Sequence, residues 1–545
     1  MNRSLRRDLY AAGAAALLVT AAVLVGRHIQ ATRHTLFVHW PPVFADWDPH
    51  LGPGTPAALA VAAATVAYGP VVAARLPWRA LLAVAWTAAL AWILSLALVD
   101  GWHRGVAARL TAREEYLRVI GRFQDIPATL RDFTHHIVSG TPAPWPAHVA
   151  GHPPAATLTF VLLDRIGLRG GGWAGMWCVT VGATGCVAVL IALRALADET
   201  LARRAAPFLV LAPAAVWQGT SADGYFAAVA AWSLALLALA LTRRSHGCAA
   251  ASGLLFGLTC YLSYGLALFT LIGAAVLALA RSGLRERPAL LLSLLAGLAV
   301  FPVVFTLAGF DWWTAYHLLV TRYYQGVGGT RPYGYWVWAN LACTALITGP
   351  ATAAGLRRTS AALLPGTGLR RSAALLPGTH PHRPAEARPG PEPQNPAPPH
   401  PATGHQRPAP PLPETHPRHP AAPHPPDGRR HPAPPHPETH PRHPADARPG
   451  SEPQNPAPPH PAPPHPTAGH RCPADARLAL LVSAALLALL VADLSGMSKA
   501  ETERIWLPFA LWLLPSCALL PRPRAWLTAQ AVLALLLNHL LLTGW

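Results

Sequence analysis

The chain has 545 residues, 52% of them hydrophobic and only 12% charged, whereas a soluble domain carries about a quarter charged residues. Most of the chain therefore has no water-facing surface to cover, which excludes a soluble globular domain. The formal net charge of +18 comes almost entirely from arginine; cytoplasmic loops and an arginine-rich composition account for it, so nucleic acid is not an expected partner.

Apolar runs rich in Ala and Leu recur along the chain, which indicates helices rather than the alternating strands of a barrel. Most of them reach the roughly 17–25 residues that a helix needs to cross the hydrocarbon core of a membrane. The runs cover residues 9–26, 57–74, 80–99, 173–194, 224–242, 264–280, 288–308, 337–354, 478–494, 505–520 and 525–543. They predict an all-α, polytopic transmembrane helical bundle of about 11–13 spans, in which the division of 195–280 stays open.

Arginines at the ends of the runs predict the orientation of a multi-pass protein of the cell (plasma) membrane. Arg3, Arg6 and Arg7 precede the first run, which places the N-terminus in the cytoplasm. Arg357 and Arg358 mark a later cytoplasmic turn. The extracytoplasmic loops are then predicted at 27–56, 100–152, 309–336 and 495–504. In the second of these loops, apolar residues at helical spacing predict short helices on the membrane surface.

Residues 357–477 have a different composition, in which Pro and His dominate and long apolar runs are missing. The segment is internally duplicated, because the sequence at 385–402 returns at 445–462 with few changes. Such a segment cannot bury enough apolar surface to offset its conformational entropy, so it predicts a disordered cytoplasmic insert with polyproline II character. The insert divides the transmembrane domain into 1–356 and 478–545, which should pack together.

The first predicted outer loop contains Asp46 and Asp48, two positions apart. Two such carboxylates can share a divalent cation such as Mg²⁺ or Mn²⁺, because hard cations prefer oxygen ligands. A solvated loop without a metal is the alternative interpretation.

The second outer loop begins with Glu114 and Glu115 and ends with His148 and the motif His152-Pro153-Pro154. A carboxylate at the membrane interface, with histidine and arginine nearby, could serve as a general base. Helix capping and ordinary surface charge are the alternative.

Two further segments, 311–338 and 495–506, add cationic and aromatic side chains on the same predicted side. Arginine forks suit phosphate oxygens and aromatic faces suit sugar rings, although an interfacial aromatic belt explains the tryptophans. A charged group at the mouth of a span is costly to embed unless it faces a cavity. The candidate residues are Arg322, Tyr323, Arg331, Tyr333, Lys499, Glu501 and Arg504.

With these features the chain resembles the GT-C superfamily of polytopic membrane glycosyltransferases, which use polyprenyl-phosphate-linked sugars. The resemblance lies in Glu114 and Glu115 in a long outer loop, in the surface helices that follow, and in the motif at His152 that opens the next run. The acidic motif of the family often contains Asp, whereas this chain has Glu-Glu. If the family pattern instead corresponds to Asp46 and Asp48, the catalytic assignment moves there.

Three other segments carry the resemblance. Residues 221–225, which include Asp223, resemble a polar break in later spans of such enzymes, and 322–341 and 495–509 look like segments of actinobacterial members that are mostly uncharacterised. The similarity covers roughly 80–356 and 478–521.

The resemblance implies an inverting transfer of a hexosyl or pentosyl group from a polyprenyl-phosphate donor to a glycan, lipid or protein of the cell envelope. Glu114 or Glu115 would deprotonate the acceptor or help to hold a divalent cation. The residues expected to bind substrate are His152, Asp223, Arg322, Tyr323, Arg331, Tyr333, Lys499, Glu501 and Arg504. The rival hypothesis is a transporter, or a lipid-handling or scaffold protein, without bond chemistry; a transporter would carry mid-membrane charges and an inverted repeat.

Overall fold

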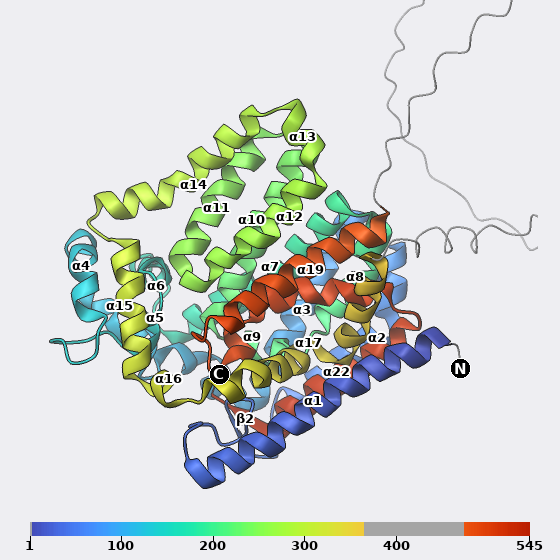
Figure 1. The fold of residues 1–545 in the computed structure, drawn as a ribbon, viewed down its shortest axis with the longest axis horizontal. Helices are drawn as coiled ribbons and strands as arrows, with labels where there is room; N and C mark the ends of the chain where they lie inside the picture. The colour runs from blue at the N-terminus through green and yellow to red at the C-terminus, as the bar shows by residue number, and fades with distance from the viewer. Residues whose placement is uncertain (1–2, 364–472, 545) are drawn as a thin grey trace, which may run out of the picture. The chain divides into compact units, whose positions relative to one another are not determined.

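The computed structural model describes residues 3–363 and 473–544, which are mostly helical (Figure 1). The first part contains α1 (Arg3–Arg33), β1 (Ala45–Trp47), α2 (Thr55–Arg75), α3 (Trp78–Ala97), η1 (Leu98–Asp100), η2 (His103–Ala107), η3 (Arg109–Thr111), η4 (Tyr116–Arg122), α4 (Ile126–Asp132), η5 (Phe133–His136), α5 (Ala147–Gly151), α6 (Ala155–Arg165) and α7 (Gly171–Leu196). The second part contains α8 (Glu199–Val210), α9 (Ala215–Gln218), α10 (Ala222–Arg243), α11 (His246–Leu262), η6 (Tyr264–Leu268), α12 (Phe269–Leu279), α13 (Arg281–Glu286), α14 (Ala289–Leu307), α15 (Trp312–Gln325), α16 (Val327–Thr330), α17 (Tyr333–Leu363), α19 (Ala474–Leu494), α20 (Thr502–Ile505), α21 (Leu507–Leu513), η7 (Leu514–Leu519), α22 (Pro523–Leu540) and β2 (Leu541–Thr543).

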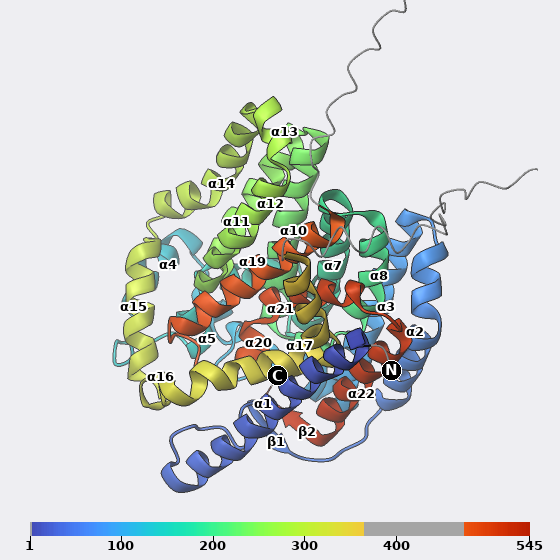
Figure 2. The same cartoon turned by 45° about the vertical axis from the view of Figure 1, so that its right-hand side comes forward.

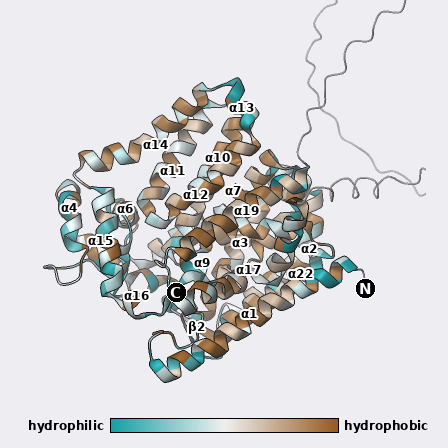
Figure 3. Ribbon diagram, viewed as in Figure 1, coloured by the Kyte–Doolittle hydropathy of each residue, from teal (hydrophilic) through white to brown (hydrophobic). Residues whose placement is uncertain are grey.

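Within these residues, seven helices are long and apolar enough to cross a membrane. They are α1, α2, α3 with η1, α7, α10, α14 and α19. Three shorter apolar helices, α11, η6 with α12, and α21 with η7, accompany them. Figure 3 shows apolar residues along α1, α14 and α19, and hydrophilic residues gathered on α4 and α13. These helices agree with the prediction of a helical membrane protein, whereas the total of 11–13 spans stays a prediction.

The loops between the long helices gather at two ends of the bundle. At one end, Asp223 in the first turn of α10 pairs with Arg504, which follows α19. At the other end, Asp8 near the start of α1 pairs with Arg357 near the end of α17. We call the first the His148 end, because His148 contacts Arg504 there, and the second the Asp8 end. In Figure 1, α5, α15 and α16 lie on the left, at the His148 end, and the N-terminus of α1 lies on the right.

A buried group of ions fastens α1 to α17, along which α1 lies in both views (Figures 1 and 2). The Asp8 carboxylate is fully buried and accepts hydrogen bonds from the guanidiniums of Arg357, at 2.5 and 2.9 Å, and Arg358, at 2.6 to 3.1 Å. Toward the other end of the two helices, the Tyr335 hydroxyl donates to the Ala22 carbonyl at 2.9 Å. Asp8 thus pairs with Arg357 and Arg358, the two arginines that the sequence predicts at a cytoplasmic turn.

The short strands β1 and β2 form a two-stranded antiparallel ribbon that the sequence does not predict. Ala45 faces Thr543, and Trp47 faces Leu541, so the segment between α1 and α2, predicted as the first outer loop, pairs with the segment that follows α22. Backbone pairing satisfies donors and acceptors that neither segment could satisfy alone.

The predicted short helices of the second outer loop are present as η4, α4, η5 and α5. Of the apolar side chains at helical spacing in this loop, Leu117 and Ile120 are half-buried, and the others are buried: Tyr116, Phe123, Leu130, Phe133 and Ile137. The predicted insert lies mostly outside the described residues. At its two boundaries, α17 continues to Leu363 and α19 begins at Ala474.

Candidate functional site

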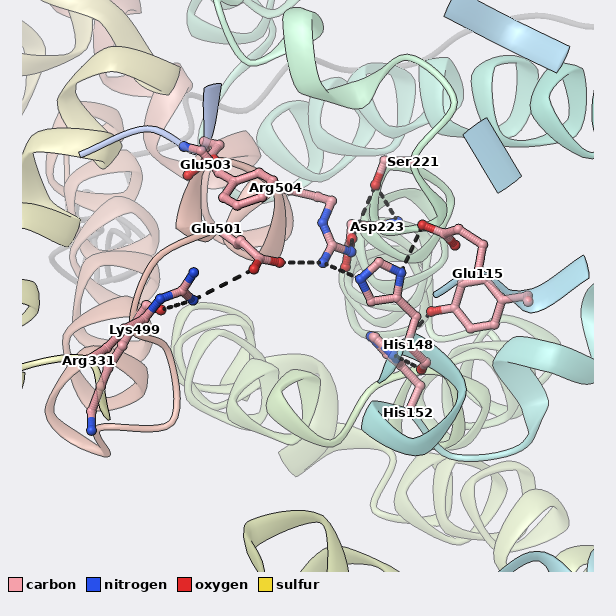
Figure 4. Close-up of polar contacts among 12 residues, drawn as sticks. Glu115, His148, His152, Ser221, Asp223, Arg331, Lys499, Glu501, Glu503 and Arg504 are labelled. Atoms are coloured by element: carbon pink, nitrogen blue, oxygen red, sulfur yellow. Dashed lines mark hydrogen bonds and ion pairs between the residues drawn. The ribbon is translucent and has the colours of Figure 1, made fainter. Parts of the chain in front are cut away.

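Arg504 stands at the centre of a charged group at the His148 end. It belongs to the short helix α20 and is 4% exposed. One terminal nitrogen, Nη1, donates to the carboxylate of Asp223. The other, Nη2, lies 3.3 Å from Nε2 of His148 and 3.4 Å from Oε2 of Glu501 (Figure 4). A planar guanidinium can meet several acceptors at fixed angles, which suits arginine to this position.

His148 connects Arg504 to Glu115. Its Nδ1 lies 2.8 Å from Oε1 of Glu115, while Nε2 faces the Arg504 guanidinium (Figure 4). Because a guanidinium can only donate, Nε2 accepts a hydrogen bond and the ring proton sits on Nδ1, where it is donated to the carboxylate. The two charged neighbours therefore fix the roles of the ring nitrogens, with Nδ1 as donor and Nε2 as acceptor.

The two adjacent glutamates have different positions. Glu115 is buried against His148, whereas the half-exposed side chain of Glu114 accepts a hydrogen bond from the backbone N–H of Ala147 at 2.9 Å. A carboxylate at the N-terminus of α5 holds that short turn in place. Of the two glutamates that the sequence left as alternatives, the structure brings Glu115 to Arg504 through His148.

His152 lies in the same turn, with Nδ1 2.7 Å from the carbonyl oxygen of His148 and 3.1 Å from the hydroxyl of Tyr116. It has an extended backbone because the following residue is proline, and α6 then begins at Ala155. Burial lowers the pKa of His152 to about 4 and raises that of Tyr116 well above its usual value. Both side chains are therefore neutral near pH 7.

Asp223 is placed by the start of α10. Ser221 caps the helix by accepting a hydrogen bond from the backbone N–H of Asp223 at 3.1 Å, and its hydroxyl donates to Oδ2 of the same residue at 3.1 Å. A carboxylate in the first turn also interacts favourably with the helix dipole. Asp223 thus faces Arg504 from a rigid element.

A second branch of the charged group runs from Glu501 to Arg331. Arg331 lies at the end of α16, with Nη1 3.7 Å from Oε1 of Glu501 and 2.8 Å from the carbonyl oxygen of Lys499. Lys499 donates from Nζ to the carbonyl of Gly328 at 2.9 Å, and its backbone N–H donates to the hydroxyl of Tyr323 at 3.0 Å. Burial lowers the pKa of Lys499 and raises that of Tyr323 to about 12.

The loop that carries this branch has an uncommon backbone. Ala500 and Glu501 both have positive φ values, 74° and 62°. Such a conformation costs a non-glycine residue roughly 1–2 kcal/mol and persists where surrounding contacts fix it. Here it turns the chain so that Glu501 and Arg504 reach the same region.

We call the connected set the Arg504 cluster. It consists of Glu115, His148, Asp223, Arg331, Lys499, Glu501 and Arg504. The Arg504 guanidinium faces Asp223, Glu501 and His148, the Arg331 guanidinium faces Glu501, and Lys499 joins the set through its backbone carbonyl, which accepts from Arg331. The members come from four parts of the chain that only the fold brings together.

Other predicted site residues make contacts elsewhere. Arg322 donates to the carbonyl of Trp145 at 3.3 Å, and the Tyr333 hydroxyl donates to the carbonyl of Leu494 at 3.3 Å. Asp46 lies on β1, exposed, 2.5 Å from Nδ1 of His39. The exposed Asp48 donates its backbone N–H to the carbonyl of Leu540 at 3.1 Å.

Two members of the site were not among the predicted site residues. His148 stands four residues before His152, and this spacing on a helix was the available signal. Glu503 is fully buried next to Arg504, and its Oε1 accepts a hydrogen bond from the backbone N–H of Phe44 at 2.8 Å. Burial raises the pKa of Glu503 to about 7. Only the fold could show this last contact, because it joins residues 459 positions apart.

The predicted divalent cation can be compared with these side chains. In the described ranges, no three His, Cys, Asp or Glu side chains form a group that could hold a metal ion. The carboxylates of the Arg504 cluster already face guanidinium or imidazole groups, so they fit cationic partners from the chain itself. The metal requirement stays a prediction.

Comparisons with models of protein families, with curated proteins and with solved structures find no match to this chain. The function is therefore inferred from the site. Its chemical capacity is an imidazole supported by a carboxylate and next to the Arg504 guanidinium, at one end of a set of apolar helices.

Proposed function

We propose that the protein is a membrane glycosyltransferase that moves a sugar from a polyprenyl-phosphate donor to an acceptor outside the cytoplasm, with inversion at the anomeric carbon. One observation carries the proposal: Glu115, Arg331 and the segment from Glu501 to Arg504 converge on one cluster, although they are far apart in the sequence. The apolar helices around the cluster would hold the polyprenyl tail and membrane lipids.

The pairing of Glu115 with His148 supplies the base in this proposal. An acceptor hydroxyl that takes the place of Arg504 at Nε2 of His148 would transfer its proton to that nitrogen, and Glu115 would stabilise the resulting imidazolium through Nδ1–H. The acceptor oxygen then forms a bond to the anomeric carbon. The bond from that carbon to the phosphate oxygen breaks, and its electron pair goes to the phosphate.

The cations stabilise the leaving group. The released lipid phosphate gains negative charge, and preorganised donors in a dry site stabilise such charge strongly. Arg331 faces Glu501 and the carbonyl of Lys499, Lys499 donates to the carbonyl of Gly328, and Arg504 pairs with Asp223, so each cation has a chain oxygen as partner. The phosphate oxygens of the donor would take the place of such chain oxygens as partners of the cations.

The test is transfer from a radiolabelled polyprenyl-phosphate sugar by the purified full-length chain. Glu115→Gln should lower the rate by up to about 10²–10⁴-fold, the range of general acid–base catalysis, because a neutral amide cannot stabilise the imidazolium of His148. Glu114→Gln is the matched control, because its side chain caps α5 instead, and its rate should change by less than about threefold. Unchanged transfer after both substitutions together would exclude a glutamate-supported His148 as the base and both glutamates as catalytic groups.

The same experiment separates the enzyme from a lipid-handling protein. A chain that binds the labelled donor but transfers nothing to any cell-envelope acceptor would support lipid handling. If transfer is absent and Arg331→Gln loses donor binding, the cations only bind the lipid phosphate and take no part in a reaction.

A further inference from the structure

A separate cavity lies at the Asp8 end, away from the Arg504 cluster. Its volume is about 310 Å³, near the lower limit of small-molecule sites in proteins. The walls come from the last residues of α7 and α10, the turn between α12 and α13, and the first turn of α19. The lining residues are Ala195, Leu196, Leu241, Thr242, Arg244, Leu279, Ala280, Ser282, Gly283 and Arg477.

The cavity combines two guanidiniums with hydroxyl groups and an apolar wall. Arg244 and Arg477 line it together with the hydroxyl-bearing Thr242 and Ser282. Arg244 is paired with Glu286, and Arg477 donates from Nη2 to the carbonyl of Leu279 at 3.3 Å, so both guanidiniums are anchored at the rim. Each still has further N–H donors that an incoming oxygen anion could use.

The surrounding charge is positive. The segments 241–247, 279–288 and 474–478 contain six arginines and two acidic residues. Of the acids nearest to the end of α7, Asp198 caps α8 and Glu199 pairs with Arg194 and Arg203, so both are engaged elsewhere. An anion is therefore the ligand that this end of the bundle favours.

We propose that this cavity binds the phosphate headgroup of an anionic phospholipid. Arginine forks and the Ser282 hydroxyl match phosphate oxygens, whereas the Thr242 hydroxyl donates to the carbonyl of Ala238 at 2.7 Å. Leu196, Leu241 and Leu279 offer apolar contact to the first part of an acyl chain. The helices that form the walls include α7, α10 and α19, all long and apolar enough to span a membrane. Basic pockets between such helices are suited to anionic headgroups of the cytoplasmic leaflet. The assignment does not depend on the proposed transfer reaction.

The test measures binding of phosphatidylglycerol, titrated into the delipidated full-length chain in detergent and followed by thermal unfolding and native mass spectrometry. Phosphatidylcholine, inorganic phosphate and glycerol phosphate form the comparison arms. In R244Q/R477Q the apparent Kd for phosphatidylglycerol should be weaker by about tenfold or more, because two charge-assisted contacts are lost. R285Q, on α13 beside Ser282 and Gly283 but outside the lining, is the control and should bind as the unchanged chain does.

A second variant tests the cavity independently, in case R244Q/R477Q fails to fold. T242W keeps both arginines but fills the cavity, and it should weaken phosphatidylglycerol binding without removing charge. Equal binding of phosphatidylcholine, or unchanged binding in both R244Q/R477Q and T242W, would overturn the proposal. Saturation by inorganic phosphate or glycerol phosphate at the same concentrations would assign the site to a free phosphate and overturn the lipid assignment.

Discussion

The two ends of the helix bundle use similar ions in different ways. At the Asp8 end, one buried carboxylate receives two guanidiniums, Arg357 and Arg358, and both of its oxygens are occupied. At the His148 end, one guanidinium, that of Arg504, is divided among two carboxylates and an imidazole. The first arrangement joins two helices. The second belongs to a cluster that joins four parts of the chain.

This difference separates a structural ion group from a candidate site. Removing one partner of a buried pair is costly wherever it occurs, so burial alone does not indicate catalysis. The Arg504 cluster differs because it also contains a histidine with a fixed tautomer and two further cations held by backbone carbonyls. Substitutions at the two ends should therefore affect different measurements.

The largest effect is expected for Arg504→Gln. Transfer from a polyprenyl-phosphate sugar should fall by about 10²–10³-fold, since a preorganised cation is lost where negative charge develops. Arg504→Lys should recover only part of the rate, because an ammonium cannot meet the same set of acceptors. Arg322→Gln, whose side chain contacts a carbonyl of Trp145, is the control and should retain most of the activity. Equal rates for Arg504→Gln and Arg322→Gln would contradict the assignment.

Asp8→Asn should act on stability instead. It leaves the buried guanidinium of Arg358 and its neighbour Arg357 without a counter-ion, and breaking such a group costs about 3–5 kcal/mol. Thermal unfolding measures this loss, while the transfer rate of the folded fraction should stay within about twofold.

Asp164→Asn is the matched comparison for Asp8→Asn, because its partner Arg169 is exposed and 3.9 Å away. Loss of such a surface pair should change stability by less than about 1 kcal/mol. If Asp8→Asn abolished transfer at full stability, the distinction between the two ends would fail.

Glu503 gives a smaller, pH-dependent effect at the His148 end. Burial raises its pKa from 4.5 to about 7, so the folded chain holds a proton that the unfolded chain releases. This contribution to stability is fully present below pH 4.5 and is lost as the pH rises to about 7, amounting to about 3 kcal/mol.

Thermal unfolding at pH 5 and pH 8 measures that loss. In Glu503→Gln the decrease in stability between the two pH values should be smaller than in the unchanged chain. An identical decrease in both would show that Glu503 does not hold the proton.

The long helices could be predicted from the sequence, because length and apolar composition determine them locally. The run 173–194 corresponds to α7, and 478–494 lies within α19. The run 505–520 is not one helix, since it divides into α20, α21 and η7, with Pro508 and Pro515 near the starts of the last two. Proline lacks the N–H that a continuous helix would need there.

The candidate site could be predicted only in part. Residue types and predicted topology brought Glu115, Glu501 and Arg504 to one side of the membrane, but not to one another, and Asp223 was named only through the resemblance of 221–225. Sequence could not choose between Glu114 and Glu115, because adjacent residues point in different directions according to local backbone geometry. The role of His148 depends on contacts with residues 33 and 356 positions away, which no local pattern encodes.

The pairing of Asp8 with Arg357 has a consequence for biosynthesis. The two residues are 349 positions apart, so α1 leaves the ribosome long before its partner helix exists. Until then the Asp8 carboxylate must stay in water or meet another cation, and α1 must wait in the lipid without its final neighbour. Docking of α1 should therefore be a late step of assembly, and truncating the chain before residue 357 during translation should leave α1 accessible to cross-linking by insertion factors.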